Sequence, residues 1–162
     1  MTSVIGLDLS LTSSGICNSS GACITVKGQD GDDRLVHLGD TISHFPRAEL
    51  AVIEDLPRGA MGGTSTGMAQ GVARYVLRMI GVPYVLVPPS SLKTYATGKG
   101  TADKVAMALA AYKRAEVEFA NDDECDAWWL RAMGLDALGE PLFELPASHR
   151  RALDKVDWPV IA

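Results

Sequence analysis

The sequence predicts an α/β fold built on one mixed β-sheet, and three observations support this. Short apolar runs alternate along the chain with segments in which apolar residues recur at helical spacing. The predicted order is three strands, a helix, a strand, a helix, a strand and then helices, which is typical of an α/β domain. The fourth and fifth strands are joined through a helix, so we expect a right-handed parallel crossover between them.

The N-terminal segment is predicted to form three short strands, at residues 3–9, 15–18 and 22–27. The first strand carries Asp8 near its end, and small hydroxylated residues follow it up to Gly15. An isolated buried carboxylate is costly unless something pairs with it. Asp8 is therefore either solvated at the strand end or placed against a cation.

The remaining elements follow from apolar runs and from residues that begin or end helices. We expect two further strands at residues 50–53 and 84–87, and helices at residues 35–42, 68–80, 90–96, 101–112 and 121–138. Gly81 is expected to end the second helix. Thr101 and Asn121 are the expected N-caps of the last two.

Apolar side chains on the last two helices have distinct positions. Val105, Leu109 and Tyr112 share one face of their helix. Trp128 and Trp129 point to different faces of the final helix, so we expect one in the core and one at an interface. Residues 1–140 are expected to form the main domain, and residues 141–162 a tail with one further short helix at residues 148–156.

At 162 residues the chain is most simply one domain. Its net charge of −5 gives no bulk electrostatic sign of nucleic-acid binding, although clustered basic residues or bound divalent cations can create a local binding face. Three cysteines without a CxxC pair indicate a reducing intracellular compartment, although Cys17 and Cys23 are placed to meet on neighbouring strands. We find no signal-peptide pattern and no stretch long enough to span a membrane.

Four carboxylates form the first candidate site: Asp8, Glu54, Asp123 and Asp126. Asp8 and Glu54 each end a predicted strand, and ligands of such sheets lie beyond the carboxyl ends of the strands. Asp123 and Asp126 are three residues apart on a predicted helix, so they share a face. Mg²⁺ is commonly held by carboxylates, and a pair of such ions can clamp the attacking and leaving oxygens of a phosphodiester.

The alternative to a metal site is that these acids have only a structural role. Asp122 and Asp123 lie in the first turn of a helix, where acidic residues interact favourably with the helix dipole. Taken alone, Asp123 is better explained in this way than as a metal ligand. Asp126 has apolar neighbours that indicate partial burial, and either strand-end acid alone is consistent with solvation. From the residues alone both interpretations stay open.

The one basic stretch of this acidic chain lies between residues 91 and 114. Lys93 and Lys104 flank the loop Gly98-Lys99-Gly100, which leads into a predicted helix N-terminus. Glycines let a backbone approach closely and a helix N-terminus attracts phosphate, so this segment is a candidate phosphate site. Lys113 and Arg114 are better explained as a solvated helix face. The pattern is not that of a Walker A loop.

Taken together, these segments resemble the RuvC family of Holliday-junction resolvases, in the RNase H-like superfamily. The resemblance extends over about residues 3–135. Its motifs are Ile5-Gly6-Leu7-Asp8 with Thr12-Ser13-Ser14-Gly15, Ala51-Val52-Ile53-Glu54, Pro89-Ser90-Ser91-Leu92-Lys93 with residues 97–104, and Asp123-Glu124-Cys125-Asp126-Ala127. Each motif is weak alone, but four motifs in the same order and spacing are fairly specific.

The resemblance implies an RNase H-like five-stranded mixed sheet of order 3-2-1-4-5, in a nuclease domain that acts as a homodimer. It implies that the four acids hold two catalytic Mg²⁺ or Mn²⁺ ions and that Lys93 and Lys104 contact the scissile phosphate region, with Lys99 between them. The implied reaction is phosphodiester hydrolysis that leaves 5′-phosphate and 3′-hydroxyl ends. Paired nicks would resolve a four-way DNA junction during recombination and repair, in the cytoplasm of a bacterial or phage-infected cell.

Two positions depart from the family pattern. In bacterial resolvases an aromatic residue shortly after the strand-four glutamate stacks near the junction centre, but this chain has Pro57 there, followed by Arg58. Arg58 is a candidate DNA contact that would substitute in part by cation–π stacking. Asp122, four residues before Asp126, is an alternative to Asp123 as a ligand. These changes resemble a phage-type or otherwise diverged member.

Other functions of the superfamily stay open. A broader branched-DNA or flap nuclease would use the same acids. A ribonuclease acting on RNA–DNA hybrids usually carries its glutamate on the first helix, whereas Glu54 follows a strand pattern. An ATP-binding protein of the sugar-kinase or actin type needs a second duplicated domain, for which this chain is too short. A non-catalytic DNA-binding protein would have no need of a full acid set.

Overall fold

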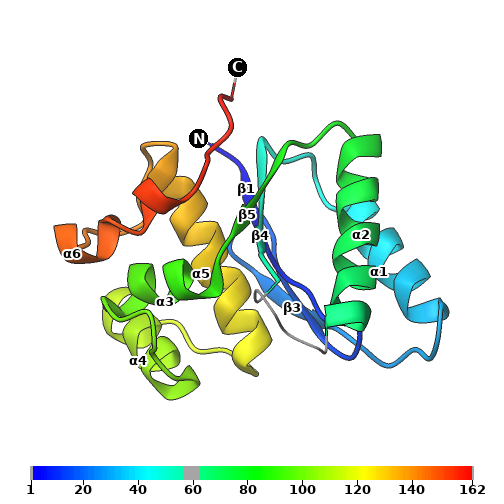
Figure 1. Ribbon diagram of the computed structural model, residues 1–162, viewed down its shortest axis with the longest axis horizontal. Helices are drawn as coiled ribbons and strands as arrows, with labels where there is room; N and C mark the ends of the chain where they lie inside the picture. Colours follow the sequence, from blue (N-terminus) through cyan, green and yellow to red (C-terminus); the bar gives the residue numbers. More distant parts are fainter. Residues whose placement is uncertain (1, 57–62, 162) are drawn as a thin grey trace.

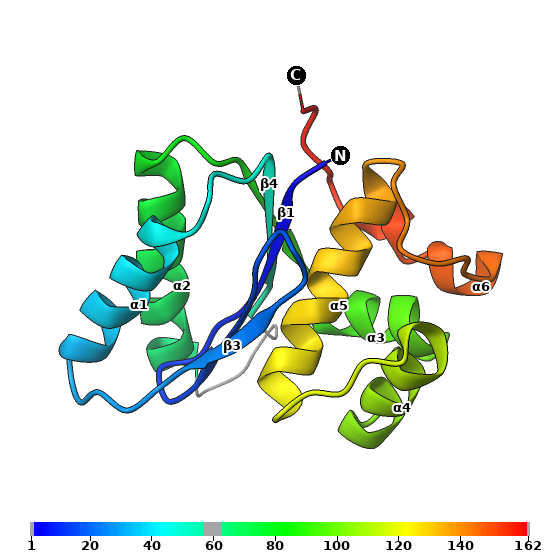
Figure 2. The same cartoon turned by 180° about the vertical axis from the view of Figure 1, so that it is seen from behind.

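The computed structural model describes residues 2–56 and 63–161, and it places a five-stranded sheet between two helical layers (Figures 1 and 2). The strands are β1 (Val4–Asp8), β2 (Ser14–Cys17), β3 (Cys23–Val26), β4 (Leu50–Glu54) and β5 (Tyr84–Val87). The helices are α1 (Asp33–His44), α2 (Gly63–Met79), α3 (Pro89–Thr97), α4 (Lys104–Ala115), α5 (Asp122–Ala137) and α6 (Ala147–Arg150), followed by the 3₁₀ turn η1 (Leu153–Lys155).

The sheet has the order β3-β2-β1-β4-β5, which confirms the predicted order. The first three strands form an antiparallel meander, and β4 and β5 extend the sheet in parallel from β1. Cys17 and Cys23 lie opposite each other across β2 and β3, and both thiols are free.

Both faces of the central strands are buried. Ile5, Leu7 and Ile53 pack into the core under α1 and α2, while Val4 and Val52 pack into the core around α5. Successive side chains of a strand point to opposite faces, so continuous apolar runs such as these suit a sheet covered on both sides. The carboxyl ends of β1 and β4 therefore emerge between two helical layers.

The second layer is organised around α5, which lies against β1, β2 and β4 on one side and α3 and α4 on the other. Trp128 and Trp129 are both buried, with 4% and 0% of their surface exposed. The rings of Phe119 and Phe143 pack over Trp128 at centroid distances of 5.8 Å each. The prediction that one of the two tryptophans lies at an interface is therefore wrong, because this chain's own aromatic side chains cover the outer face of α5.

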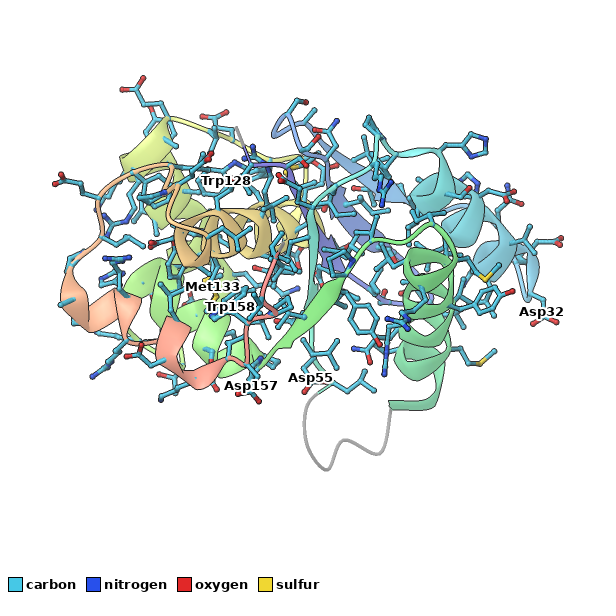
Figure 3. The ribbon with its side chains drawn as sticks, turned by 90° about the horizontal axis from the view of Figure 1, so that it is seen from above. Asp32, Asp55, Trp128, Met133, Asp157 and Trp158 are labelled. Atoms are coloured by element: carbon cyan, nitrogen blue, oxygen red, sulfur yellow. The ribbon has the colours of Figure 1, made fainter. Side chains whose placement is uncertain are left out.

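The C-terminal segment folds onto the same layer. The predicted helix at residues 148–156 is instead α6 and η1, because the chain turns at Arg151 and brings Ala152 into the core. Trp158 packs partly buried against that core, on the side of the sheet that carries Met133 (Figure 3). The carboxylate of the buried Asp136 accepts two hydrogen bonds from Arg150, at 3.1 and 2.7 Å, which tie α6 to α5.

The start of α4 differs from the prediction. Its N-cap is Asp103, whose carboxylate accepts a hydrogen bond from the main-chain N–H of Ala106 at 2.8 Å. Thr101 lies in the preceding turn, so it does not cap the helix. Asn121 does cap α5, as expected. Among the helices in the described ranges, none is both long and apolar enough to cross a membrane.

Candidate functional site

Two of the four candidate acids are brought together by the parallel pairing of β1 and β4. Leu7 of β1 is in register with Ile53 of β4, so Asp8 and Glu54, the next residues, occupy neighbouring positions at the strand ends. Both side chains are partly buried. The sheet topology alone therefore places two carboxylates side by side at the edge where ligands of α/β sheets bind.

The other two acids are on the first turns of α5, which approaches the sheet unusually closely. A Cβ atom on Gly6 would overlap the main-chain oxygen of Ala127, and a Cβ atom on Gly15 would overlap that of Asp123. On Gly134 a Cβ atom would lie 2.6 Å from Cγ2 of Val52. The backbone of α5 is therefore in direct contact with the strands of the sheet. This contact places the N-terminal end of α5 beside the carboxyl end of β1 (Figure 1).

Polar contacts hold the N-terminus of α5 against β3. The side chain of Asn121 accepts a hydrogen bond from the N–H of Glu124 at 3.1 Å. Thr25 of β3 donates to the carboxylate of Glu124 at 2.7 Å and accepts from the amide of Asn121 at 2.7 Å. Satisfied N-terminal groups stabilise the first turn of a helix, so the turn that carries Asp123 and Asp126 is fixed in position.

The four carboxylates act on one another electrostatically. Burial, followed by the charges of Glu54, Asp126 and Asp123, raises the pKa of Asp8 well above its usual value. Burial and the charge of Asp126 raise the pKa of Glu54 to about 7. Burial raises the pKa of Asp126 to about 6. Since nearby carboxylates oppose one another's ionisation, the ionised cluster requires positive charge close by.

Two lysines supply part of that charge. Lys93 of α3 and Lys104 of α4 both lower the pKa of Glu54 and of Asp126, against the effect of burial. Lys99 is exposed in the loop between these helices and is not among the groups that shift these carboxylates. Arg58 lies outside the described residues. The structure thus brings two of the four predicted basic residues to the acids.

Asp122 and Asp123 have different partners. Asp122 forms an ion pair with Lys104. Asp123 accepts a hydrogen bond from the hydroxyl group of Ser13 and acts on the pKa of both Asp8 and Asp126. Asp123 is therefore the residue of the two that faces Asp8.

The donor set fits a hard divalent cation in its chemistry. Mg²⁺ and Mn²⁺ prefer oxygen ligands, and carboxylates are their usual protein ligands. Within residues 2–56 and 63–161, however, no three His, Cys, Asp or Glu side chains converge closely enough to hold an ion as they stand. Asp8 and Glu54 nevertheless lie close enough for each to shift the pKa of the other. Binding an ion would require side-chain rotations that turn the four carboxylates toward a common point.

Sequence reasoning missed two features of this site. The first is Ser13, which positions Asp123 and belongs to a run of small polar residues that gives no sign of which hydroxyl group is used. The second is the glycine contact with α5, which depends on residues more than 100 positions apart. A glycine within a strand can indicate close backbone approach, and this was the available signal for Gly6 and Gly15.

Comparison with solved structures identifies the fold. The chain is similar to the Thermus thermophilus RuvC structure, with a TM-score of 0.69 and 18% sequence identity, over 86% of this chain and 98% of that one. It is also similar to T. thermophilus RuvC in complex with Holliday junction substrate, with a TM-score of 0.66 and 21% identity, over 81% of this chain and 91% of that one. No protein-family model and no curated protein sequence matches the chain. The protein therefore has a RuvC-like fold.

Proposed function

We propose that this protein is a metal-dependent, structure-selective endodeoxyribonuclease that resolves four-way DNA junctions by paired phosphodiester hydrolysis. The observation that carries the proposal is the meeting of Asp8 and Glu54 with Asp123 and Asp126 at one edge of a RuvC-like sheet. A similar structure is RuvC bound to Holliday junction substrate, which supports branched DNA as the substrate. We infer a diverged, phage-type member, acting in recombination and repair in the cytoplasm.

The four acids would hold two Mg²⁺ ions, and Mn²⁺ would substitute for them in assays. When bound, such ions activate a water molecule and stabilise charge on the phosphate. Lys93 and Lys104 would bind the phosphate oxygens, because both already act on the acid cluster. Ser13 would keep Asp123 in position through its hydrogen bond. Lys99 and Arg58 would contact DNA further from the reacting phosphate.

Paired nicks require two sites, and we propose that a homodimer supplies them. A two-fold axis would match the symmetry of a four-way junction. The exposed face of α2 is the candidate contact, because Met68, Tyr75 and Met79 expose 42%, 66% and 69% of their surface there. Gly71, on the same face, would leave space for a close approach of two helices. In this arrangement residues 1–140 carry the nuclease site and residues 141–162 form a C-terminal tail, of which Ala152 and Val156 pack in the core around α5.

The test compares substrates under the same conditions. A four-way junction, a flap, an RNA–DNA hybrid and single-stranded DNA are each incubated with Mg²⁺, with Mn²⁺ and with a chelator. We expect symmetric nicks with 5′-phosphate ends in the junction, and none with the chelator. Equal cutting of flaps and junctions would instead indicate a broader branched-DNA nuclease, and preferential cutting of the hybrid would indicate a ribonuclease. Binding without any cutting would show a non-catalytic DNA-binding protein.

A further inference from the structure

A cavity of about 580 Å³ opens beside the acid cluster, between α4, α5 and the loop that joins them. Lys104 and Asp126, both members of the candidate nuclease site, line one end of it. Apolar side chains form most of the remaining lining, among them Met107, Val117 and Cys125. Its volume is in the range of small-molecule sites, which is roughly 300–1,000 Å³.

The wall on α4 is an exposed apolar stripe. Val105, Leu109 and Tyr112 are spaced by four and three residues, and they expose 75%, 48% and 51% of their surface. The side of α4 that enters the core carries Met107 and Ala111 instead. Apolar side chains gathered on an exposed face mark binding grooves more often than isolated ones do, and these three all line the cavity.

The inner lining of the cavity, from α4, α5 and the loop between them, packs against the core. Phe119 packs against Trp128, and the indole N–H of Trp129 donates a hydrogen bond to the main-chain oxygen of Met107 at 3.2 Å. Met107 and Cys125 are each only 2% exposed. The inner lining is therefore buried, whereas Tyr112, which is 51% exposed, is an aromatic side chain of the cavity that solvent also reaches.

We propose that this cavity accepts an unstacked nucleobase of the DNA strand whose phosphate lies at the acid cluster. This inference rests on the proposed nuclease function. A base and its phosphate belong to one nucleotide, so a base adjoining a phosphate held by Lys104 is within reach of the cavity that Lys104 borders. Apolar and aromatic walls suit the face of any base, which predicts stacking with little sequence preference. Unstacking costs least where bases are already unpaired, as at a branch point.

The experiment asks whether removing a base from the DNA and removing the Tyr112 ring from the protein affect binding independently. Junctions carry an abasic site at each of the nucleotides flanking the cleaved phosphate, and their affinities are measured in Ca²⁺ for the wild type and for Tyr112→Ala. We expect one abasic position to weaken wild-type binding about tenfold, and the same position to have no further effect on Tyr112→Ala. Tyr112→Phe should behave as wild type, since the ring is retained. Leu142→Ala is the control, because Leu142 is an exposed apolar residue that lines neither the cavity nor the exposed face of α2.

If the abasic site and Tyr112→Ala weakened binding additively at every abasic position tested, the inference would be overturned. A change in the oligomeric state of Tyr112→Ala would also overturn it, because the exposed apolar face of α4 would then be a protein contact. Val105→Asp, at a more exposed lining position, provides a second variant that leaves the core untouched. Cleavage is measured separately in Mg²⁺. If the protein cleaves junctions but the abasic site and Tyr112→Ala show no coupling, only the base site is refuted. If the two are coupled but no junction is cleaved, only the nuclease function is refuted.

Discussion

Gly15 of β2 and Asp123 of α5 lie backbone against backbone, so that no side chain fits between them. Gly15 is also the register partner of Asp8 across β1 and β2. One glycine therefore separates the strand acid from the helix acid, and its lack of a side chain sets how closely they approach. A side chain at position 15 would therefore push Asp123 away from Asp8.

Gly15→Ala is expected to destabilise the protein by about 1–3 kcal/mol, as overpacking of a close-packed interface does, and to lower nuclease activity further by displacing Asp123. Urea unfolding and junction cleavage measure the two effects. Gly67→Ala is the control, because Gly67 lies in α2 and an added Cβ would meet only Leu56, at an ordinary contact distance of 3.9 Å. It should be neutral or stabilising by up to about 1 kcal/mol. Equal stability of both variants would refute the close contact.

Asp8→Asn is expected to reduce cleavage of a four-way junction by at least about a hundredfold, since metal-ion stabilisation of a transition state is worth several kcal/mol. Junction binding should remain largely intact, because phosphate contacts by lysines dominate it. Cleavage assays and gel shifts measure the two quantities. Asp32→Asn, at the far end of α1 (Figure 3), is the control. Normal cutting by Asp8→Asn would show that the metal-site assignment is wrong.

Ser13→Ala is expected to raise the Mg²⁺ concentration needed for half-maximal cleavage by about tenfold, because it removes the hydrogen bond that positions Asp123. Loss of a group that orients a metal ligand typically costs 10–100-fold in metal affinity or activity. Titrations with Mg²⁺ at saturating DNA make the measurement. Ser148→Ala, on the exposed surface of α6, should have no effect. An unchanged Mg²⁺ requirement in Ser13→Ala would contradict the positioning role.

The metal-free protein should lose stability as the pH rises from about 5 to 8. The pKa of Glu54 is about 7 and that of Asp126 about 6 in the folded state, above their ordinary values of 4.5 and 3.8. The folded state therefore binds more protons than the unfolded state in this window, and stability falls as the pH rises. We expect a loss on the order of 2 kcal/mol.

Chemical denaturation across this pH range in the presence of a chelator tests the expectation. Glu54→Gln should flatten the profile and be more stable than the wild type at pH 8, because it removes a charge from the cluster. Glu144→Gln, an exposed residue, should keep the wild-type profile. Added Mg²⁺ should restore stability at pH 8 in the wild type, since binding to the folded state stabilises it. A flat wild-type profile would be inconsistent with carboxylates of raised pKa.

Arg150→Ala should lower the free energy of unfolding, because it leaves the buried carboxylate of Asp136 with the hydroxyl group of Tyr95 at 3.1 Å and without its cation. The double variant Asp136→Asn, Arg150→Ala should recover part of the loss, since no charge then remains buried. Arg151→Ala, an exposed neighbour, is the control. If the single and double variants were equally unstable, the ion pair would not be what holds α6 on α5.

The sequence predicts most of the sheet because its signals are local. An apolar run followed by an acid marks the ends of β1 and β4, and glycines mark the ends of α2 and α3. The predicted start of α4 is wrong because Thr101 and Asp103 are both suitable N-caps within three residues, and only the backbone conformation decides between them. The burial of both Trp128 and Trp129 depends on Phe119 and Phe143, whose positions periodicity does not show.

The candidate site is predictable only in part. Asp8 and Glu54 follow from strand ends, whereas the choice between Asp122 and Asp123 depends on which one faces Ser13 and which one faces Lys104. Helical spacing alone is compatible with either Asp122 or Asp123 as the ligand, because both share a helix face with Asp126. The stripe of Val105, Leu109 and Tyr112 was visible as a shared face, but a helical pattern does not distinguish a face turned to the core from one that lines a cavity.

The central position of α5 has a consequence for how the protein unfolds on heating. The helix that carries Asp123 and Asp126 is also the one around which the second layer packs. A partly unfolded species that has released α5 has lost the acid pair and the core together, so we expect no such species to show the proposed nuclease activity. Loss of the proposed nuclease activity on heating and global unfolding should therefore follow a single transition. A partly inactivated sample should then consist of fully active and fully inactive molecules.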